Sequence, residues 1–182
     1  ESWGGERTIH SFRDAQYEPN LDGGPHSLAD FDFPPDGAWP DPCGMVERLH
    51  AQGVRVMLWQ IPVIPDHDVE DAQLIADRAA LIERGFAVLE EDGTPYRNRG
   101  WWFPRALLPD FTSAEARRWW TEKRRYLLAE VGIDGFKTDG GEHAWGNELR
   151  FGDGTGGEVS NNRYPRWERR RGGTECGSGW SR

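Results

Sequence analysis

Residues 54–61 read VRVMLWQI, an almost unbroken apolar run. Strands of a parallel sheet are buried on both faces, and their sequences therefore lack the alternation of a half-exposed strand. A predicted helix over residues 42–52 leads directly into this run. It has Asp41 as N-cap, Pro42 at its first position and Gly53 just beyond its end. The segment therefore predicts a helix that delivers the chain into a buried strand.

The same order of elements recurs further along the chain. A predicted helix begins with a capping box of Thr112 and Glu115, is amphipathic as far as Val131, and leads into a predicted strand over residues 133–138. Polar residues follow each strand. Alternating helices and buried strands are typical of a parallel α/β fold, whose chemistry lies at the carboxyl ends of the strands.

The remaining segments are predicted from turn residues and apolar spacing. They are a short strand over 8–15, a long loop over 16–40, a helix over 69–84, a hairpin over 86–97 and a loop over 98–110. The last of these loops carries two adjacent tryptophans, Trp101 and Trp102, and aromatic residues on loops favour a role in binding.

Length and charge restrict the class of protein. The chain has 182 residues, a net charge of −9 and a sequence pI of about 5.1. This acidic balance argues against a surface for nucleic acid or an anionic membrane, and no run of 18 apolar residues predicts a membrane span. A complete (β/α)₈ barrel needs about 250 residues, so the chain has room for only part of one.

The sequence contains no motif that indicates a bound cofactor or metal ion. The histidines lack metal-ligand spacing, and Cys43 and Cys176 define neither a disulfide framework nor a metal site. We therefore predict no metal and no cofactor. Sparse cysteine favours a reducing compartment such as the cytoplasm, and the sequence leaves location and oligomeric state otherwise open. The ten tryptophans have two interpretations, core packing or flat platforms for sugar rings.

The stretch GFKTDGGE, residues 135–142, carries the candidate chemistry. Alternate residues of a strand share a face, so Lys137 and Asp139 point the same way, and Phe136 and Thr138 point toward the packing helices. A carboxylate beside a buried ammonium keeps a lowered pKa and stays ionised, as a nucleophile must. The alternative is a structural ion pair followed by an ordinary glycine turn.

Four ordered blocks resemble glycoside hydrolase family 31, the α-glucosidase and α-xylosidase family. Besides GFKTDGGE, which resembles the nucleophile motif at the end of the fourth barrel strand, they are FPPDGAWPDPCGMVERLHAQGVRVMLWQIPVIP at 33–65, PDFTSAEARRWW at 109–120 and SNNRYP at 160–165. The resemblance covers most of residues 1–165. It implies an α/β fold, a partial (β/α)₈ TIM barrel truncated on its C-terminal side, with residues 1–165 as the catalytic domain.

The resemblance also implies a mechanism and its residues. The family cleaves terminal α-linked sugars with retention, through a covalent glycosyl-enzyme. Asp139 matches the nucleophile, and Lys137, Glu142, Trp59 and Trp102 are expected to contact an oligosaccharide or glycoside substrate. The family's acid/base aspartate lies beyond its equivalent of residues 160–165, so we expect it outside this chain.

Two alternatives stay open at this point. The chain resembles, less closely, a related family of α-galactosidases that also place an aspartate after a KxD pattern. As written, it is also consistent with an inactive fragment that at most binds sugar, because part of a barrel leaves strand edges unpaired. Residues 166–182, RWERRRGGTECGSGWSR, have no apolar period and are predicted to be a disordered, aberrant tail.

Overall fold

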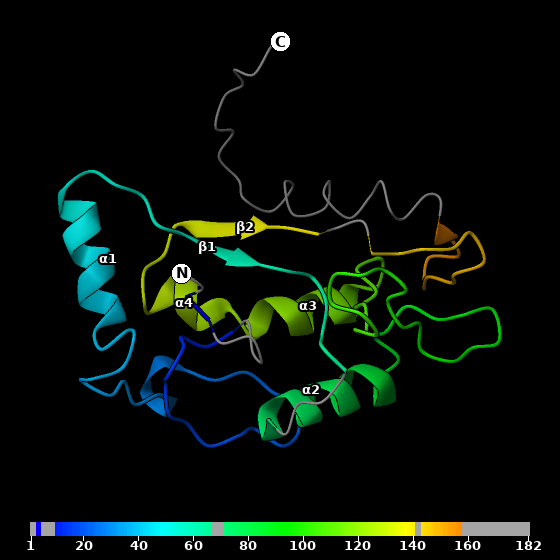
Figure 1. Ribbon diagram of the computed structural model, residues 1–182, viewed down its shortest axis with the longest axis horizontal. Helices are drawn as coiled ribbons and strands as arrows, with labels where there is room; N and C mark the ends of the chain where they lie inside the picture. Colours follow the sequence, from blue (N-terminus) through cyan, green and yellow to red (C-terminus); the bar gives the residue numbers. More distant parts are fainter. Residues whose placement is uncertain (1–2, 5–9, 67–70, 141–142, 158–182) are drawn as a thin grey trace, which may run out of the picture.

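Helices and strands alternate along the chain as the sequence predicts (Figure 1). The structure, a computed structural model, describes residues 3–4, 10–66, 71–140 and 143–157. Its elements in chain order are η1 Leu28–Asp30, α1 Pro42–Ala51, β1 Met57–Gln60, α2 Ala72–Glu83, α3 Ala114–Glu122, α4 Arg125–Ala129 and β2 Gly135–Thr138. Helix α1 therefore leads into β1, and α2, α3 and α4 lie between β1 and β2.

Strands β1 and β2 lie side by side and run parallel. Their register pairs Met57 with Gly135 and ends with Gln60 opposite Thr138. Parallel neighbours need a long crossover connection, and here the crossover contains α2, α3 and α4. Figure 1 shows α3 and α4 along one side of the two strands, and α1 beside their amino-terminal ends. Both strands therefore end at the same edge.

Both predicted strands form, but each is shorter than the sequence pattern. Before β1, the Val56 amide donates to the Asp134 side chain at 2.7 Å, while the Asp134 amide donates to the Val56 carbonyl at 2.8 Å. At the other end, the Asp139 amide donates to the Gln60 carbonyl at 2.9 Å. A side chain thus replaces one backbone partner where the regular ladder begins.

Helices α1 and α2 follow their capping signals. The Asp41 side chain accepts a hydrogen bond from the Gly44 amide at 2.8 Å, which confirms the predicted N-cap of α1. Helix α2 begins at Ala72, where the Asp71 side chain accepts from the Leu74 amide at 2.8 Å. Its predicted start at residue 69 lies outside the described residues.

The predicted capping box of the third helix is wrong. Ser113 is the N-cap, and its hydroxyl accepts from the Ala116 amide at 3.3 Å. The Thr112 hydroxyl instead donates to Asp110 at 2.7 Å, in a turn that precedes the helix. The single predicted helix is also divided into α3 and α4 at Lys123 and Arg124, whose side chains are both buried.

The N-terminal strand is also wrong over the described residues 10–15. Phe12 makes one isolated bridge to Gly4, and its ring packs edge-on against Trp3 with 5.2 Å between ring centroids. This segment is therefore held against the rest of the core by aromatic packing. The predicted hairpin pairs its backbone as expected, with the Tyr96 amide donating to the Val88 carbonyl at 2.8 Å, although it forms bridges instead of full strands.

The buried residues form three clusters that place the loops relative to the strands. The first cluster, with Leu58 and Leu127, joins the strands to α1 and α4. The second, with Ile61 and Tyr96, joins the loops that follow β1 and β2. The third, with Leu81 and Trp119, joins α2 to α3. Because the second cluster begins at Ile61, directly after β1, it anchors the loops beside the carboxyl ends of the strands.

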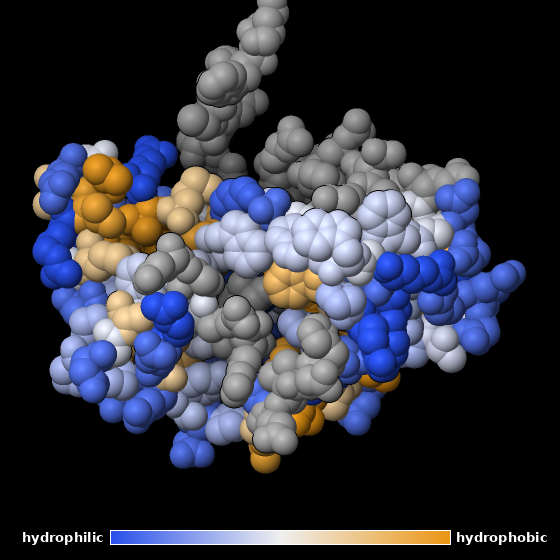
Figure 2. Space-filling view, in the orientation of Figure 1, coloured by the Kyte–Doolittle hydropathy of each residue, from blue (hydrophilic) through white to orange (hydrophobic). Residues whose placement is uncertain are grey.

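Part of the molecular surface is apolar. Figure 2 shows apolar side chains gathered over the end of the molecule where α1 leads into β1. Val54 and Met57 are exposed in that segment. Strands of parallel sheets are normally covered on both faces, and within the described residues β1 and β2 pair only with each other. In the described ranges, no helix has the length and apolar character that a membrane crossing requires.

Candidate active site

The strand register brings the predicted site residues together on one face. Trp59 of β1 lies opposite Lys137 of β2. Asp139 follows Lys137 by two positions, so its side chain leaves the backbone on the same side. The structure therefore places Trp59, Lys137 and Asp139 at one end of the strand pair, as the alternation predicts for the last two.

Asp139 is held by two donors on one of its oxygens. The Trp59 indole Nε1 donates to Oδ2 at 3.0 Å, and the Lys137 ammonium forms an ion pair with the same oxygen. The ion pair with Lys137, followed by the bond from Trp59, holds the pKa of Asp139 below its usual range. The carboxylate is therefore ionised at neutral pH.

The predicted burial of the ammonium is wrong. The Lys137 side chain is 57% exposed and the Asp139 side chain 40% exposed. Both side chains lie at the carboxyl end of β2 and are open to solvent. The pKa of Asp139 is consequently lowered by direct bonds, and burial acts in the opposite direction.

The opposite face of the strand ends is fixed to the helices. Gln60 donates from Nε2 to the Thr138 hydroxyl at 2.8 Å, and its Oε1 accepts from the Arg124 Nε at 2.9 Å. The Arg124 guanidinium lies 3.5 Å above the ring of Trp120 in α3. Thr138 thus points toward the helix layer, as predicted, and this bonding holds the strand ends beneath Asp139.

Directly after Asp139, the backbone turns at Gly140 against a wall of side chains. Gly140 has φ +67°, and a Cβ atom there would lie 2.6 Å from His143 Nε2, 2.8 Å from the Trp102 ring and 3.1 Å from Ile61 Cδ1. Trp102 also lies beside Trp59, with 6.2 Å between ring centroids. The two predicted aromatic residues therefore line the same site as the carboxylate.

Two residues that sequence reasoning did not select hold this wall. The buried Asn98 side chain donates to the carbonyls of Trp102 at 2.6 Å and Phe103 at 2.9 Å, and its Nδ2 lies 3.1 Å from His143 Nδ1. His143 is buried, with its ring 5.7 Å from that of Trp102. Neither residue belongs to a motif, so only the folded loops identify them.

The remaining candidates have separate outcomes. Glu142, predicted to contact substrate, lies outside the described residues, as do residues 158–182 with the predicted tail. Trp101 is 88% exposed and stacks on Trp102. Asp110, just before α3, is buried and accepts hydrogen bonds from the Thr112 and Gly152 amides at 2.9 and 2.6 Å.

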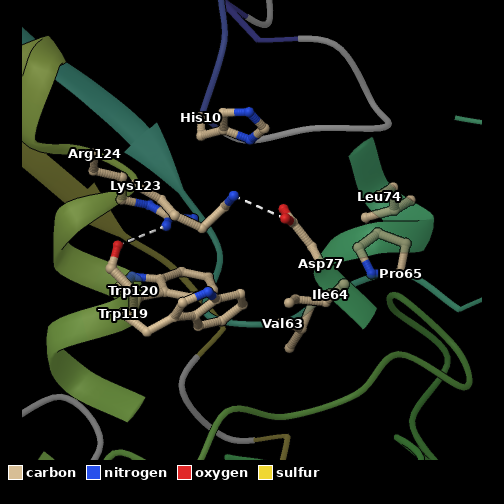
Figure 3. Close-up of a pocket in the computed structure, with 10 residues that line it drawn as sticks. All are labelled: His10, Val63, Ile64, Pro65, Leu74, Asp77, Trp119, Trp120, Lys123 and Arg124. Carbon is tan, nitrogen blue, oxygen red and sulfur yellow. Dashed lines mark hydrogen bonds and ion pairs between the residues drawn. The ribbon is translucent and has the colours of Figure 1, made fainter. Parts of the chain in front are cut away.

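A small cavity between α2 and the junction of α3 and α4 is separate from this site (Figure 3). It has a volume of about 20 Å³, and Lys123 Nζ lies 2.8 Å from Asp77 Oδ1 across it. Burial raises the pKa of Asp77 and lowers the pKa of Lys123. Burial, with the nearby Lys123 and Arg124, also holds the pKa of His10 well below its ordinary value. These groups form part of the core, and Asp139 does not line the cavity.

Indole rings beside an ionised carboxylate, at the carboxyl ends of parallel strands, occupy the position at which (β/α)₈ enzymes place their active sites. The family model described as glycosyl hydrolases family 31 TIM-barrel domain matches residues 11–170. The chain therefore belongs to glycoside hydrolase family 31, and the related-family α-galactosidase is set aside. This membership also shows that the catalytic domain has the (β/α)₈ fold, of which the described residues form a part.

Two curated relatives are similar over most of the chain. A 1,3-alpha-isomaltosidase of Kribbella flavida is 54% identical over 165 residues, which are 91% of this chain and 23% of that protein. An isomaltosyltransferase of Sporosarcina globispora is 41% identical over 166 residues, again 91% of this chain and 15% of that protein. The chain thus spans less than a quarter of the length of either relative.

Solved structures have the same fold over this region. The cycloalternan-degrading enzyme from Trueperella pyogenes in complex with isomaltose superposes with a TM-score of 0.88 at 54% identity, covering 92% of this chain and 24% of that one. The cycloalternan-forming enzyme from Listeria monocytogenes in complex with a pentasaccharide substrate superposes with a TM-score of 0.85 at 41% identity. Both are enzymes of oligosaccharides.

Proposed function

We propose that this chain carries the nucleophile half of a retaining α-glycosidase and that Asp139 is the nucleophile. The supporting observation is an ionised carboxylate at the carboxyl end of β2, held by Lys137 and Trp59 beside an aromatic wall. In retaining enzymes of this kind, the nucleophile and the acid/base lie roughly 5–5.5 Å apart. We assign the acid/base to no residue of this chain.

The hydrogen bonds of Asp139 distinguish its two oxygens. Oδ2 accepts from both Trp59 and Lys137. Within the described residues, Oδ1 accepts one hydrogen bond, from the Gly140 amide at 3.2 Å. Attack on the anomeric carbon therefore falls to Oδ1, which then carries the glycosyl group while the donors on Oδ2 stabilise the carboxyl group that leaves in the second step.

The other predicted residues have supporting roles in this proposal. Lys137 keeps Asp139 ionised and offers a donor to a sugar hydroxyl, and Trp59 fixes the orientation of the carboxylate. Trp102 forms an apolar wall for the sugar ring. Glu142 is retained as a substrate-contacting residue because it follows the nucleophile by three positions in the motif.

We propose α-linked glucose oligosaccharides as the substrate class. The support is the similarity to an isomaltosidase and an isomaltosyltransferase and to an enzyme solved with isomaltose. An α-xylosidase of Lactiplantibacillus pentosus is less similar, at 29% identity. Glucose is therefore favoured over xylose as the unit that is attacked.

Covalent trapping tests the nucleophile directly. The full-length gene product would be incubated with a fluorinated α-glucosyl fluoride, which forms the glycosyl-enzyme and slows its hydrolysis, and then measured by mass spectrometry of the intact protein and of its proteolytic peptides. We expect one glycosyl unit attached to the peptide that contains Asp139, and none in Asp139→Asn. Labelling of another carboxylate, or turnover that survives Asp139→Asn, would refute the assignment. Binding of sugar without any turnover would instead favour a sugar-binding fragment.

A further inference from the structure

Three indole rings form a row that leads from the nucleophile to solvent. Trp59 bonds to Asp139, and its ring centroid lies 6.2 Å from that of Trp102. The Trp102 centroid lies 6.3 Å from that of Trp101, with 25° between the ring planes. The row therefore begins at the reacting carboxylate and ends in a ring that is 88% exposed.

Hydrogen bonds hold the loop that carries Trp101 and Trp102. The buried Asn98 side chain binds the carbonyls of Trp102 and Phe103. Phe103 and Arg105 have φ of +50° and +63°, a left-handed conformation that costs free energy in residues other than glycine. Strain of this kind persists where the surrounding structure fixes it, so the loop has a defined shape.

A second set of contacts fixes the base of the loop. The Arg99 guanidinium donates to the Trp145 carbonyl at 2.9 Å and forms ion pairs with Glu90 at 2.6 Å and Glu148 at 2.8 Å. Gly100 packs against the Trp145 ring, since a Cβ atom at Gly100 would lie 3.0 Å from the Trp145 Nε1. Trp101 is thus presented on an anchored loop.

Among the described residues, Trp102 is the ring stacked on Trp101, and the Trp101 side chain stays 88% exposed. One ring face stacks on Trp102 and the other faces water. A large aromatic ring is among the side chains whose burial contributes most to folding, so leaving it exposed forgoes that contribution. An open ring face, joined through Trp102 and Trp59 to the carboxylate, is suited to stacking on the apolar face of a sugar.

Resting on the proposed function, we propose that Trp101 binds a sugar unit beyond the one attacked by Asp139, and that the row selects oligosaccharides over shorter glycosides. The unit at the carboxylate contacts Trp59 and Trp102, and a further unit of the same chain stacks on the open face of Trp101. Trp101 is therefore a residue that determines substrate length, and the chemical step does not depend on it.

The test compares substrates of increasing length in the full-length gene product. We expect Trp101→Ala to lower kcat/KM for an α-linked glucose tetrasaccharide about tenfold, the loss of one ring stack, and to leave kcat/KM for α-glucosyl fluoride, which has no group beyond the attacked unit that could stack, unchanged. Trp101→Phe should retain most of the activity on the tetrasaccharide. Leu21→Ala, at a similarly exposed apolar position, is the matched control and should change neither value.

The outcomes separate this inference from the proposed function. Equal kcat/KM losses on both substrates, a lowered Tm in Trp101→Ala, or no loss at all would overturn the role of Trp101 while leaving Asp139 as nucleophile. If the wild-type protein hydrolyses no α-glycoside, the proposed function fails. In that case the affinity for the tetrasaccharide, measured by calorimetric titration of the wild-type and Trp101→Ala proteins, decides the inference. Equal affinities of the two proteins would refute it.

Discussion

Gly140→Ala is the substitution that tests most directly how the backbone places Asp139. Gly140 has φ +67°, so an alanine there takes on a left-handed conformation that costs about 1 kcal/mol. Its methyl group would also lie 2.6 Å from His143 Nε2 and 2.8 Å from the Trp102 ring, closer than packed atoms come. Overpacking of this kind adds about 1–3 kcal/mol.

Gly85 offers a matched control for the backbone contribution. It follows the C-cap of α2 at φ +65°, and an added Cβ there would meet nothing within 4 Å. Gly85→Ala therefore carries the same conformational cost without the clash. We expect it to lower the free energy of unfolding by about 1 kcal/mol, and Gly140→Ala by about 1–3 kcal/mol more.

The assays are denaturant unfolding and steady-state kinetics on the full-length gene product. Relief of the clash moves Trp102, the backbone at Asp139, or both, and a displacement of about 1 Å in a reacting group can cost about a hundredfold in rate. We therefore expect kcat/KM to fall on that order in Gly140→Ala and to be unchanged in Gly85→Ala. Equal stability losses in the two variants, with full activity in Gly140→Ala, would show that the turn does not position the site.

Three further predictions concern charged groups. In Lys137→Met, the pKa of Asp139 should rise, because the pairing that lowers it is lost; the acidic limb of the pH profile of kcat/KM should move to higher pH, and an unshifted limb would contradict the pairing. Lys123→Met should cost about 3–5 kcal/mol in urea unfolding, since it leaves the buried Asp77 carboxylate unpaired. The cost should shrink as pH falls, because the folded state of that variant binds a proton on Asp77 more readily than the unfolded chain does. The double variant Lys123→Met with Asp77→Leu should recover most of the loss, and additive losses would argue against the pair. Asp110→Ala should cost about 1–3 kcal/mol by the same measurement, because it leaves donors now at 2.6 to 2.9 Å without their acceptor; wild-type stability would show that water replaces it.

The sequence predicted what local periodicity determines. The apolar run over 54–61 and the N-cap at Asp41 each depend on a few neighbouring residues, and the structure confirms the strand and the cap. The shared face of Lys137 and Asp139 follows from the two-residue period of a strand alone. The family resemblance had the same local basis, since each of its blocks is a continuous stretch.

Contacts between distant segments were beyond that reasoning. The bond from Trp59 to Asp139 depends on the register that sets Trp59 opposite Lys137, and no single stretch encodes a register. Asn98 and His143 meet only after two loops fold together. The predicted N-cap of the third helix was wrong for another reason. Thr112 and Ser113 are both suitable N-cap residues, and the Thr112 hydroxyl is instead bound to Asp110, which leaves Ser113 as the cap.

Two lysine–carboxylate pairs in this chain show why pairing alone does not mark a nucleophile. Asp77 and Lys123 are almost fully buried, and burial raises the pKa of Asp77 although the ammonium lies 2.8 Å away. Asp139 and Lys137 are partly exposed, and direct bonds lower the pKa of Asp139. Under the proposed function, a substrate that covers Asp139 excludes water from the carboxylate. The surroundings of Asp139 then become more like those of the buried Asp77. In the proposed mechanism the Trp59 bond to Oδ2 then becomes important, because the indole is a neutral donor that keeps its bond while Lys137 also donates to a sugar hydroxyl. We therefore propose that both donors together keep Asp139 ionised for attack, and that Trp59 holds the carboxylate while the ammonium is shared with the sugar.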